Sequence, residues 1–318
     1  MTCRTLTLVS AMSVFLTAIS ANPSQAQQYV FRSVDVPGAA YTSAQCNNNL
    51  GQIVGFNPTA GFSSPNENFL LSLGVFEPVH GYPGGESTLL IAVNPSGGKM
   101  VGSWTDKTGS EHGFLLFKKK YTSFDYPGAV WTEAIDINDS GDIVGTYFDV
   151  TAAHGFKLQS GTFTNLDPPG AVGSFAETIN NSGAVVGYYS LTDPLLNSGL
   201  QGYFLNEGSF TSVNYPGAAQ TAASGLNSSG QIVGWYVDNS GIYHGFSDFS
   251  GTFATVDYPG AANSEAIEIN DAGQILGDWY GPAPDFADQH GYLATPLPGT
   301  HDAERGNGFA QKGRVPLR

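Results

Sequence analysis

The chain has 318 residues, with 41 Gly, 18 Pro and 12% aromatic residues, and only 12% of its residues are charged. This composition favours β-strands and turns over surface helices, which need many Ala, Glu, Lys and Leu residues. The formal net charge is −15, and no Lys or Arg occurs between Leu158 and Glu304. Such a surface repels polyanions, which excludes nucleic acid and leaves neutral molecules, cations or basic proteins as expected partners.

Residues 1–26 have the features of a secretory signal peptide. Arg4 is the only charged residue, the apolar run LTLVSAMSVFLTAIS follows, and the segment ends in Ser24-Gln25-Ala26. We predict cleavage after Ala26 and a secreted or periplasmic bacterial protein. The alternative, a membrane anchor, needs about 20 apolar residues. This run is shorter, and no other segment is apolar enough, so we expect no membrane span.

The signal peptide carries one of the two cysteines, Cys3. Its removal leaves Cys46 without a partner for an intramolecular disulfide. We expect Cys46 to be a small buried apolar residue, so that stability comes from the core.

Two sequence markers recur with the same period through residues 27–296. The first is a Pro-Gly pair, which begins at Pro37, Pro83, Pro127, Pro169, Pro216 and Pro259. The second is the Gly that ends Ile-Val-Gly or a close variant, at Gly55, Gly102, Gly145, Gly187, Gly234 and Gly277. A period of roughly 40–50 residues is typical of propeller blades and longer than that of the common helical repeats.

Each unit reads as four short strands, which we call A to D. In the third unit they are TEAIDIND, DIVGTYFD, HGFKLQS and TFTNLD, separated by turn residues such as Ser140-Gly141 and Gly161. Asn-Asp-Ser-Gly suits a tight hairpin between strands A and B. Six A–B–C sets are expected, at 41–73, 84–118, 128–160, 170–207, 217–250 and 260–296.

The fourth strands reveal how the repeat closes. One D strand, at 29–37, precedes the first A strand, and no D strand follows the sixth A–B–C set. The sequence therefore predicts an all-β fold, a six-bladed β-propeller of four-stranded blades in which the N-terminal strand completes the last blade and hides its edge. A linear solenoid would leave an orphan strand at each end. Residues 297–318 lack the repeat, and we predict a polar, disordered tail there.

The repeated pattern also resembles a known family. His112-Gly113-Phe114, His154-Gly155-Phe156 and His244-Gly245-Phe246, with the surrounding IVG and Pro-Gly motifs, resemble the bacterial extracellular repeat family named for its His-Ala-Phe tripeptide. The resemblance covers 29–295 and departs from the pattern at Asn68 and Gln201. It implies a secreted bacterial protein, but no common activity.

The histidines do not indicate a metal site, because equivalent residues of different blades lie around a ring, too far apart to share one ion. We expect them to serve the fold, and we predict no metal site. The stretch DINDSGD at 136–142 partly matches a calcium loop, but Tyr147 stands where that loop needs a glutamate. A hairpin is the preferred interpretation, a weak Ca²⁺ site is the alternative, and no other cofactor is expected. The chain contains none of the common catalytic motifs, and no catalytic residue is proposed.

Aromatic residues recur at the end of strand B, and variable loops with Asp residues follow them. In a propeller the B–C and D–A loops emerge on one face, which we call the BC/DA face. Aromatic rings beside carboxylates suit sugars or basic side chains, whereas packing between blades is the structural alternative. The candidate ligand-binding residues are Trp104, Tyr147, Asp149, Tyr189, Trp235, Tyr236, Asp238, Trp279 and Tyr280.

The expected function is that of a secreted, non-catalytic and monomeric binding module, which recognises a glycan or a protein through the BC/DA face. The alternatives are a carbohydrate-active lyase or hydrolase, or a structural envelope protein. A deep central pocket with paired acids would favour the enzyme, and a flat aromatic face would favour binding.

Overall fold

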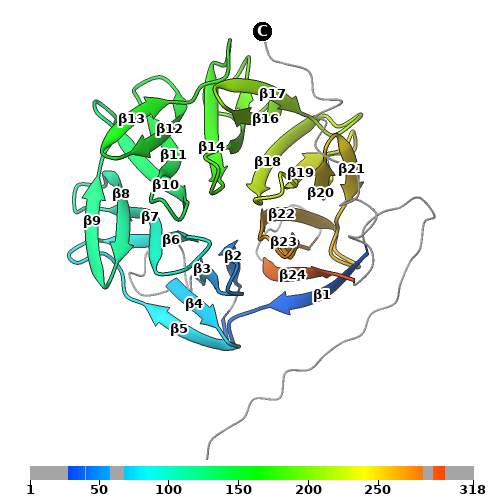
Figure 1. Cartoon of the computed structure of the whole chain (residues 1–318), viewed down its shortest axis with the longest axis horizontal. Helices are drawn as coiled ribbons and strands as arrows, with labels where there is room; N and C mark the ends of the chain where they lie inside the picture. The colour runs from blue at the N-terminus through cyan, green and yellow to red at the C-terminus, as the bar shows by residue number, and fades with distance from the viewer. Residues whose placement is uncertain (1–27, 40, 58–67, 282–288, 298–318) are drawn as a thin grey trace, which may run out of the picture.

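The computed structural model describes residues 28–39, 41–57, 68–281 and 289–297. These residues form strands and turns without helices, and the strands make six four-stranded antiparallel sheets around a central axis (Figure 1). The fold is a six-bladed β-propeller, as the repeat predicts. The predicted signal peptide and residues 298–318 of the predicted tail lie outside the described residues.

In every blade strand A lies nearest the axis, and the strands follow one another outward (Figure 1). From A to D, the first three blades are β2 (Ser43–Asn47), β3 (Ile53–Phe56), β4 (Asn68–Ser72) and β5 (Val75–Val79); β6 (Ser87–Val93), β7 (Lys99–Thr105), β8 (Glu111–Phe117) and β9 (Lys120–Phe124); β10 (Trp131–Ile137), β11 (Ile143–Phe148), β12 (Ala153–Gln159) and β13 (Thr162–Asn165). The next two are β14 (Gly173–Ile179), β15 (Val185–Ser190), β16 (Leu200–Asn206) and β17 (Ser209–Val213); β18 (Gln220–Leu226), β19 (Ile232–Val237), β20 (Tyr243–Phe249) and β21 (Thr252–Thr255).

The sixth blade joins the two ends of the repeat region. It consists of β22 (Asn263–Ile269), β23 (Ile275–Tyr280), β24 (His290–Pro296) and β1 (Tyr29–Val34). Strand β1 runs antiparallel to β24, with Tyr29 opposite Pro296 and Val34 opposite Gly291. Val34 is buried in a cluster with Leu276 and Leu293. The prediction that the N-terminal strand completes the last blade is therefore confirmed.

The recurring glycines stand where two backbones approach closely. A Cβ atom at Gly145 would lie 2.0 Å from the carbonyl oxygen of Glu133 on the neighbouring A strand, and the five equivalent glycines meet an A-strand carbonyl oxygen at 1.9–2.1 Å. A Cβ atom at Gly155 would come within 3.3 Å of the Cβ atom of Ala176 in the next blade. The second marker, the Ile-Val-Gly glycine, thus serves packing within a blade, and the tripeptide glycine of the third blade serves packing against the next blade.

Every A strand contains a β-bulge at the same place. In β10 the register against β11 shifts between Ala134 and Asp136, and the other five A strands shift at equivalent positions. A bulge bends its strand and re-aims the side chains that follow it. The residues directly after the bulge are Cys46, Ala92, Asp136, Thr178, Gly225 and Glu268, and four of them line the cavity on the axis that is described below.

Asparagines in the A–B hairpins link the blades into a ring. The Oδ1 atom of Asn180 accepts the N–H groups of Ser182 and Ala184 in its own hairpin, and its Nδ2 atom donates to the carbonyl oxygen of Asn227 in the next blade. Equivalent bonds join Asn48 to Asn94, Asn138 to Asn180, Asn227 to Asn270 and Asn270 to Asn48, whereas Asn94 donates to Asp139 Oδ1. The predicted hairpin residues therefore also close the ring.

Candidate functional site along the propeller axis

Most of the aromatic residues that the sequence predicts to bind a ligand lie inside stacks of rings. Tyr147 is stacked between Tyr126 of the preceding D–A turn, with ring centroids 3.6 Å apart, and His154 of β12, at 5.0 Å. Trp104, Tyr236 and Trp279 have the same two neighbours in their own blades, a turn tyrosine and a strand-C histidine. Both faces of these four rings are covered by the fold.

Tyr189 is the fifth ring of this series, in a blade that lacks the histidine. It is 2% exposed and packs in the core beside Tyr203. Its hydroxyl donates to Gln201 Oε1, over 3.1 Å. Gln201 thus takes the position of the histidine without changing the placement of the ring.

The histidines are held by aspartates on both sides. His154 Nδ1 lies 2.8 Å from Asp167 Oδ2 in the D–A turn, and His154 Nε2 lies 3.5 Å from Asp149 Oδ2 in the B–C loop. His112 and His244 have the same pair of aspartates, at 2.7–3.7 Å, and His290 bonds Asp35. His112, His154 and His244 therefore each tie a strand, a loop and a turn together, and His290 ties a strand to a turn.

The two aspartates that the sequence predicts to bind a ligand, Asp149 and Asp238, belong to these cross-links. Asp149 and Asp238 each face the histidine of their own blade and accept backbone N–H groups of their own loop. Hydrogen bonds from Thr151 lower the pKa of Asp149 to about 2, and backbone hydrogen bonds, led by that of Ile242, lower the pKa of Asp238. Among the described residues no group of three or more His, Cys, Asp or Glu side chains is arranged to hold a metal ion.

Trp235 and Tyr280 lie outside the histidine stacks, and both are partly exposed, as Trp104 and Trp279 also are. Trp235 of β19 lies beside Tyr188 of β15, with centroids 6.3 Å apart, and beside Tyr243, at 5.4 Å. Tyr188 in turn stacks on Phe175 of β14 at 5.1 Å. These partly exposed rings form a continuous series across the fourth and fifth blades.

Three glutamates of the A strands lie near this series: Glu133 of β10, Glu177 of β14 and Glu265 of β22. All three carboxylates raise the pKa of the Tyr188 hydroxyl, after the larger effect of burial, although they come from three blades. Tyr280 donates a long hydrogen bond to Glu265 Oε2, over 3.5 Å. We call the three glutamates with Tyr188, Trp235 and Tyr280 the axial glutamate site.

These glutamates are partly exposed, yet protein surrounds them and shifts their titration. Burial raises the pKa of Glu133 to about 8, and the carboxylates of Glu111 and Glu177 add to the shift. Burial also raises the pKa values of Glu177 and Glu265 to about 7, against the hydrogen bonds of Tyr188 and Tyr280. No basic side chain forms an ion pair with any of the three in the part of the chain that the structure describes.

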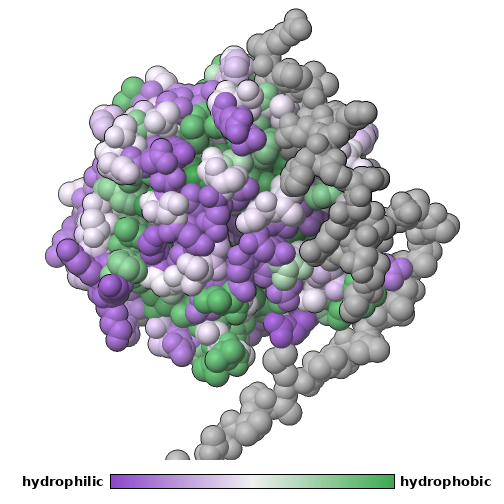
Figure 2. Space-filling view, viewed as in Figure 1, coloured by the Kyte–Doolittle hydropathy of each residue, from purple (hydrophilic) through white to green (hydrophobic). Residues whose placement is uncertain are grey.

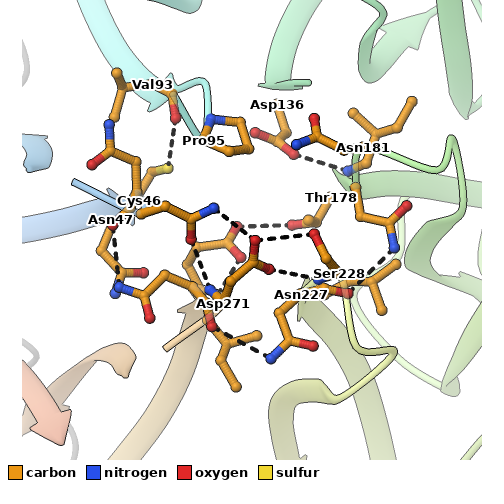
Figure 3. A pocket seen from close by; sticks show the side chains of 18 residues that line it. Cys46, Asn47, Val93, Pro95, Asp136, Thr178, Asn181, Asn227, Ser228 and Asp271 are labelled. Atoms are coloured by element: carbon orange, nitrogen blue, oxygen red, sulfur yellow. Dashed lines mark hydrogen bonds between the residues drawn. The ribbon is translucent and has the colours of Figure 1, made fainter. Parts of the chain in front are cut away.

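A second group of polar residues surrounds a cavity on the axis near the A–B hairpins (Figure 3). This axial cavity has a volume of about 40 Å³, and Cys46, Asp136, Thr178 and Glu268 line it. Hydrophilic residues also gather around the centre of the face seen in Figure 2. The axis of this propeller is therefore polar and acidic, whereas the blades pack through apolar residues.

The carboxylates of the axial cavity are hydrogen-bonded but not neutralised by a basic group. Asp136 Oδ2 accepts the N–H of Ile179, over 2.8 Å, and Thr178 Oγ1 donates to Glu268 Oε2, over 3.0 Å. Burial raises the pKa of Asp136 to about 7 and raises the pKa of Glu268. Burial also raises the pKa of the Cys46 thiol, which is the buried free cysteine that the sequence predicts.

The stretch at 136–142 forms a hairpin and does not surround one point. Asp136 lines the axial cavity, whereas Asn138 Oδ1 caps its own hairpin by accepting the N–H of Asp142. Asp139 points to the neighbouring hairpins and bonds Ser96 and Asn181. The hairpin interpretation of this stretch is confirmed.

Sequence reasoning did not identify the carboxylates on the axis. A glutamate in an alternating strand reads as a residue of the solvent side, and the bulge, which the pattern does not reveal, changes which residues face the axis. One signal was present: Glu133 and Asp136 in one unit, and Glu265 and Glu268 in another, stand in strands that must lie innermost.

Comparisons with known proteins do not assign a function. No protein-family model and no curated protein matches the chain. Among solved structures, a triple mutant of AofleA from Arthrobotrys oligospora matches 81% of this chain and 83% of its own, with 12% identity and a TM-score of 0.47. This similarity is too low to transfer any property. The described residues contain no helix with the length and apolarity needed to cross a membrane.

Proposed function

We propose that this protein is a binding module that takes a Lys or Arg side chain of a basic protein partner at the axial glutamate site. The observation that carries the proposal is the position of Glu133, Glu177 and Glu265 on the innermost strands of three blades, without an ion pair to a described basic residue. Buried carboxylates are costly unless they are paired. A cationic side chain from a partner would supply the pairing charge.

The surroundings of the site favour a cation over a neutral ligand. The net charge of −15 and the absence of Lys and Arg between Leu158 and Glu304 attract a basic partner and speed its approach. Partly exposed Trp235 and Tyr188 offer ring faces or edges near the carboxylates, and cations bind favourably over such faces. A glycan would use the rings but would leave the carboxylates unpaired.

A carbohydrate-active lyase or hydrolase is the second candidate, because the acids converge in the centre of the molecule. Glycoside hydrolysis needs one protonated and one ionised carboxyl group, and such sites push the two pKa values apart. Here burial raises the pKa values of Glu133, Glu177 and Glu265 in the same direction. The three pKa values are therefore not pushed apart in opposite directions, as a division into acid and base roles would need.

The test compares peptides and variants of matched charge. A Lys- and Arg-containing peptide should bind the full chain, and binding should weaken at high salt. The double variant Glu133→Gln/Glu177→Gln should weaken binding at least tenfold, as should Trp235→Ala. The control Glu77→Gln/Glu207→Gln loses the same charge at exposed sites and should bind like the wild type. Isothermal titration calorimetry measures all four proteins.

Two results would contradict the proposal. Equal loss in the control double variant would indicate a general attraction to an acidic surface. Binding of neutral oligosaccharides, with turnover that Glu133→Gln abolishes, would indicate the enzyme instead.

We also infer that the mature protein is exported and begins at Gln27. The support is the sequence of residues 1–26 alone. Mass spectrometry of the protein from its native host would detect a chain that begins at Gln27, and a chain that retains Met1 would contradict export with cleavage. Sedimentation of the same sample tests the predicted monomer.

A further inference from the structure

The axial cavity is lined by residues with side-chain oxygen atoms from four blades. Asn47 comes from β2, Asp136 from β10, Thr178 from β14 and Glu268 from β22, and all four are buried lining residues (Figure 3). Thr178 and Glu268 are in direct contact, over 3.0 Å, although 90 residues separate them in the chain.

Asn47 is the exception in its position of the repeat. The equivalent residues of the other five blades are all apolar: Val93, Ile137, Ile179, Leu226 and Ile269. Asn47 is 5% exposed, its Nδ2 atom donates to the carbonyl oxygen of Gln274, and its Oδ1 atom has no hydrogen-bond partner. A buried acceptor without a partner destabilises the folded state. A ligand that this oxygen can bind would remove that cost.

The chemistry of the lining selects the ligand. Two carboxylates, one amide oxygen and one hydroxyl are hard oxygen donors, which Ca²⁺ prefers at flexible geometry. A cavity of about 40 Å³ holds an ion with one or two waters, since one water needs roughly 10–15 Å³. A sugar ring or an amino-acid side chain is too large. The two negative charges match a divalent ion.

We propose that the axial cavity binds one divalent cation of the Ca²⁺ type through Asn47, Asp136, Thr178 and Glu268, with water as the remaining ligand. Only two of these groups are carboxylates, so the site differs from the metal sites that three or more His, Cys, Asp or Glu side chains form. The ion would join the first, third, fourth and sixth blades across the axis. Binding to the folded state alone would stabilise the closed ring.

The experiment uses the full chain, freed of metal with a chelator and then titrated with Ca²⁺. Calorimetry should give one site per chain, and millimolar Ca²⁺ should raise the melting temperature. Asp136→Asn, Glu268→Gln and Asn47→Ile should each weaken Ca²⁺ binding at least tenfold. Asn47→Ile introduces the residue that Ile179 and Ile269 already provide in other blades, so the fold should tolerate it.

A second readout separates loss of the site from loss of the fold. Without Ca²⁺, Asp136→Asn and Glu268→Gln should melt at a higher temperature than the wild type, because each removes a buried carboxylate that no basic group neutralises. The control Glu265→Gln changes a carboxylate at the axial glutamate site and should leave the Ca²⁺ response unchanged. Absence of binding to the wild type, or loss in Glu265→Gln but not in Asp136→Asn, would overturn the proposal.

Discussion

The histidines of the repeated tripeptide stabilise the fold through both ring nitrogens. His154 Nδ1 bonds Asp167 over 2.8 Å, and its ring covers one face of Tyr147. The same arrangement recurs in three other blades, although the aspartate of the B–C loop is described in only two of them. A catalytic group would stand once per molecule, so repetition itself indicates a structural role.

This role predicts the effect of replacing His154. His154→Ala should lower the free energy of unfolding by about 1–3 kcal/mol, because Asp167 loses a hydrogen-bond partner and Tyr147 loses its cover. His154→Gln should retain part of that energy, as Gln201 occupies the equivalent place. Urea denaturation measures both variants. His80→Ala, at an exposed side chain, is the control, and equal stability of His154→Ala and the wild type would contradict the role.

Trp235 and Tyr236 show which part of the site the sequence cannot predict. Trp235 and Tyr236 are neighbours in one strand, and therefore point to opposite faces of the sheet. The sequence marks both as candidates, yet the stack on Tyr215 and His244 covers Tyr236 and leaves Trp235 partly exposed. Which face each ring occupies follows from the neighbouring blade, which no local pattern specifies.

At the scale of elements, strand order is the feature that the sequence predicts best. The count of D strands requires β1 to complete the sixth blade, and the pairing of β1 with β24 confirms it. The strand bounds also follow the turn residues, because Gly and Asn-Asp steps have few alternatives to a turn. The bulges could not be predicted, since one extra residue in a strand leaves the turn spacing unchanged.

The closure predicts a specific weakness of the ring. Val34→Asp places a charge in the cluster with Leu276 and Leu293, so it should detach β1 and lower the melting temperature by at least several degrees. The freed edge of β24 should also promote self-association. Calorimetry and light scattering measure the two effects. Arg32→Ala, at an exposed position of the same strand, should change neither.

At the scale of the whole molecule, the chain concentrates acidic groups on its axis. Glu133, Glu177 and Glu265 are far apart in sequence, and the closed ring places all three on innermost strands. The sequence could therefore predict the ring of six blades but not which acidic residues lie along its axis. Since burial raises the pKa values of these glutamates to about 7–8, their ionisation opposes folding.

The sign of the pH dependence follows from linkage. Below the unfolded pKa near 4.5 each glutamate is protonated in both states, so it has no effect on stability. As pH rises toward 8, the unfolded chain ionises first, and folding is progressively disfavoured. The melting temperature should therefore fall between pH 5 and pH 8.5, as differential scanning calorimetry measures. The triple variant Glu133→Gln/Glu177→Gln/Glu265→Gln should show a much smaller fall, and an equal fall would contradict this origin.

The bulge that recurs in every A strand has a consequence for how such a chain can diverge. It gives each of six duplicated units one residue beside the axis, and those residues now differ in size and charge, from Ala92 to Glu268. Only Gly225 is fixed by crowding, since a Cβ atom there would lie 2.8 Å from the Cα atom of Glu268. The other five can mutate one at a time while the glycines that shape the blades stay constant. Substitutions at these positions would thus change the polarity and charge beside the axis while the framework of the six blades stays the same.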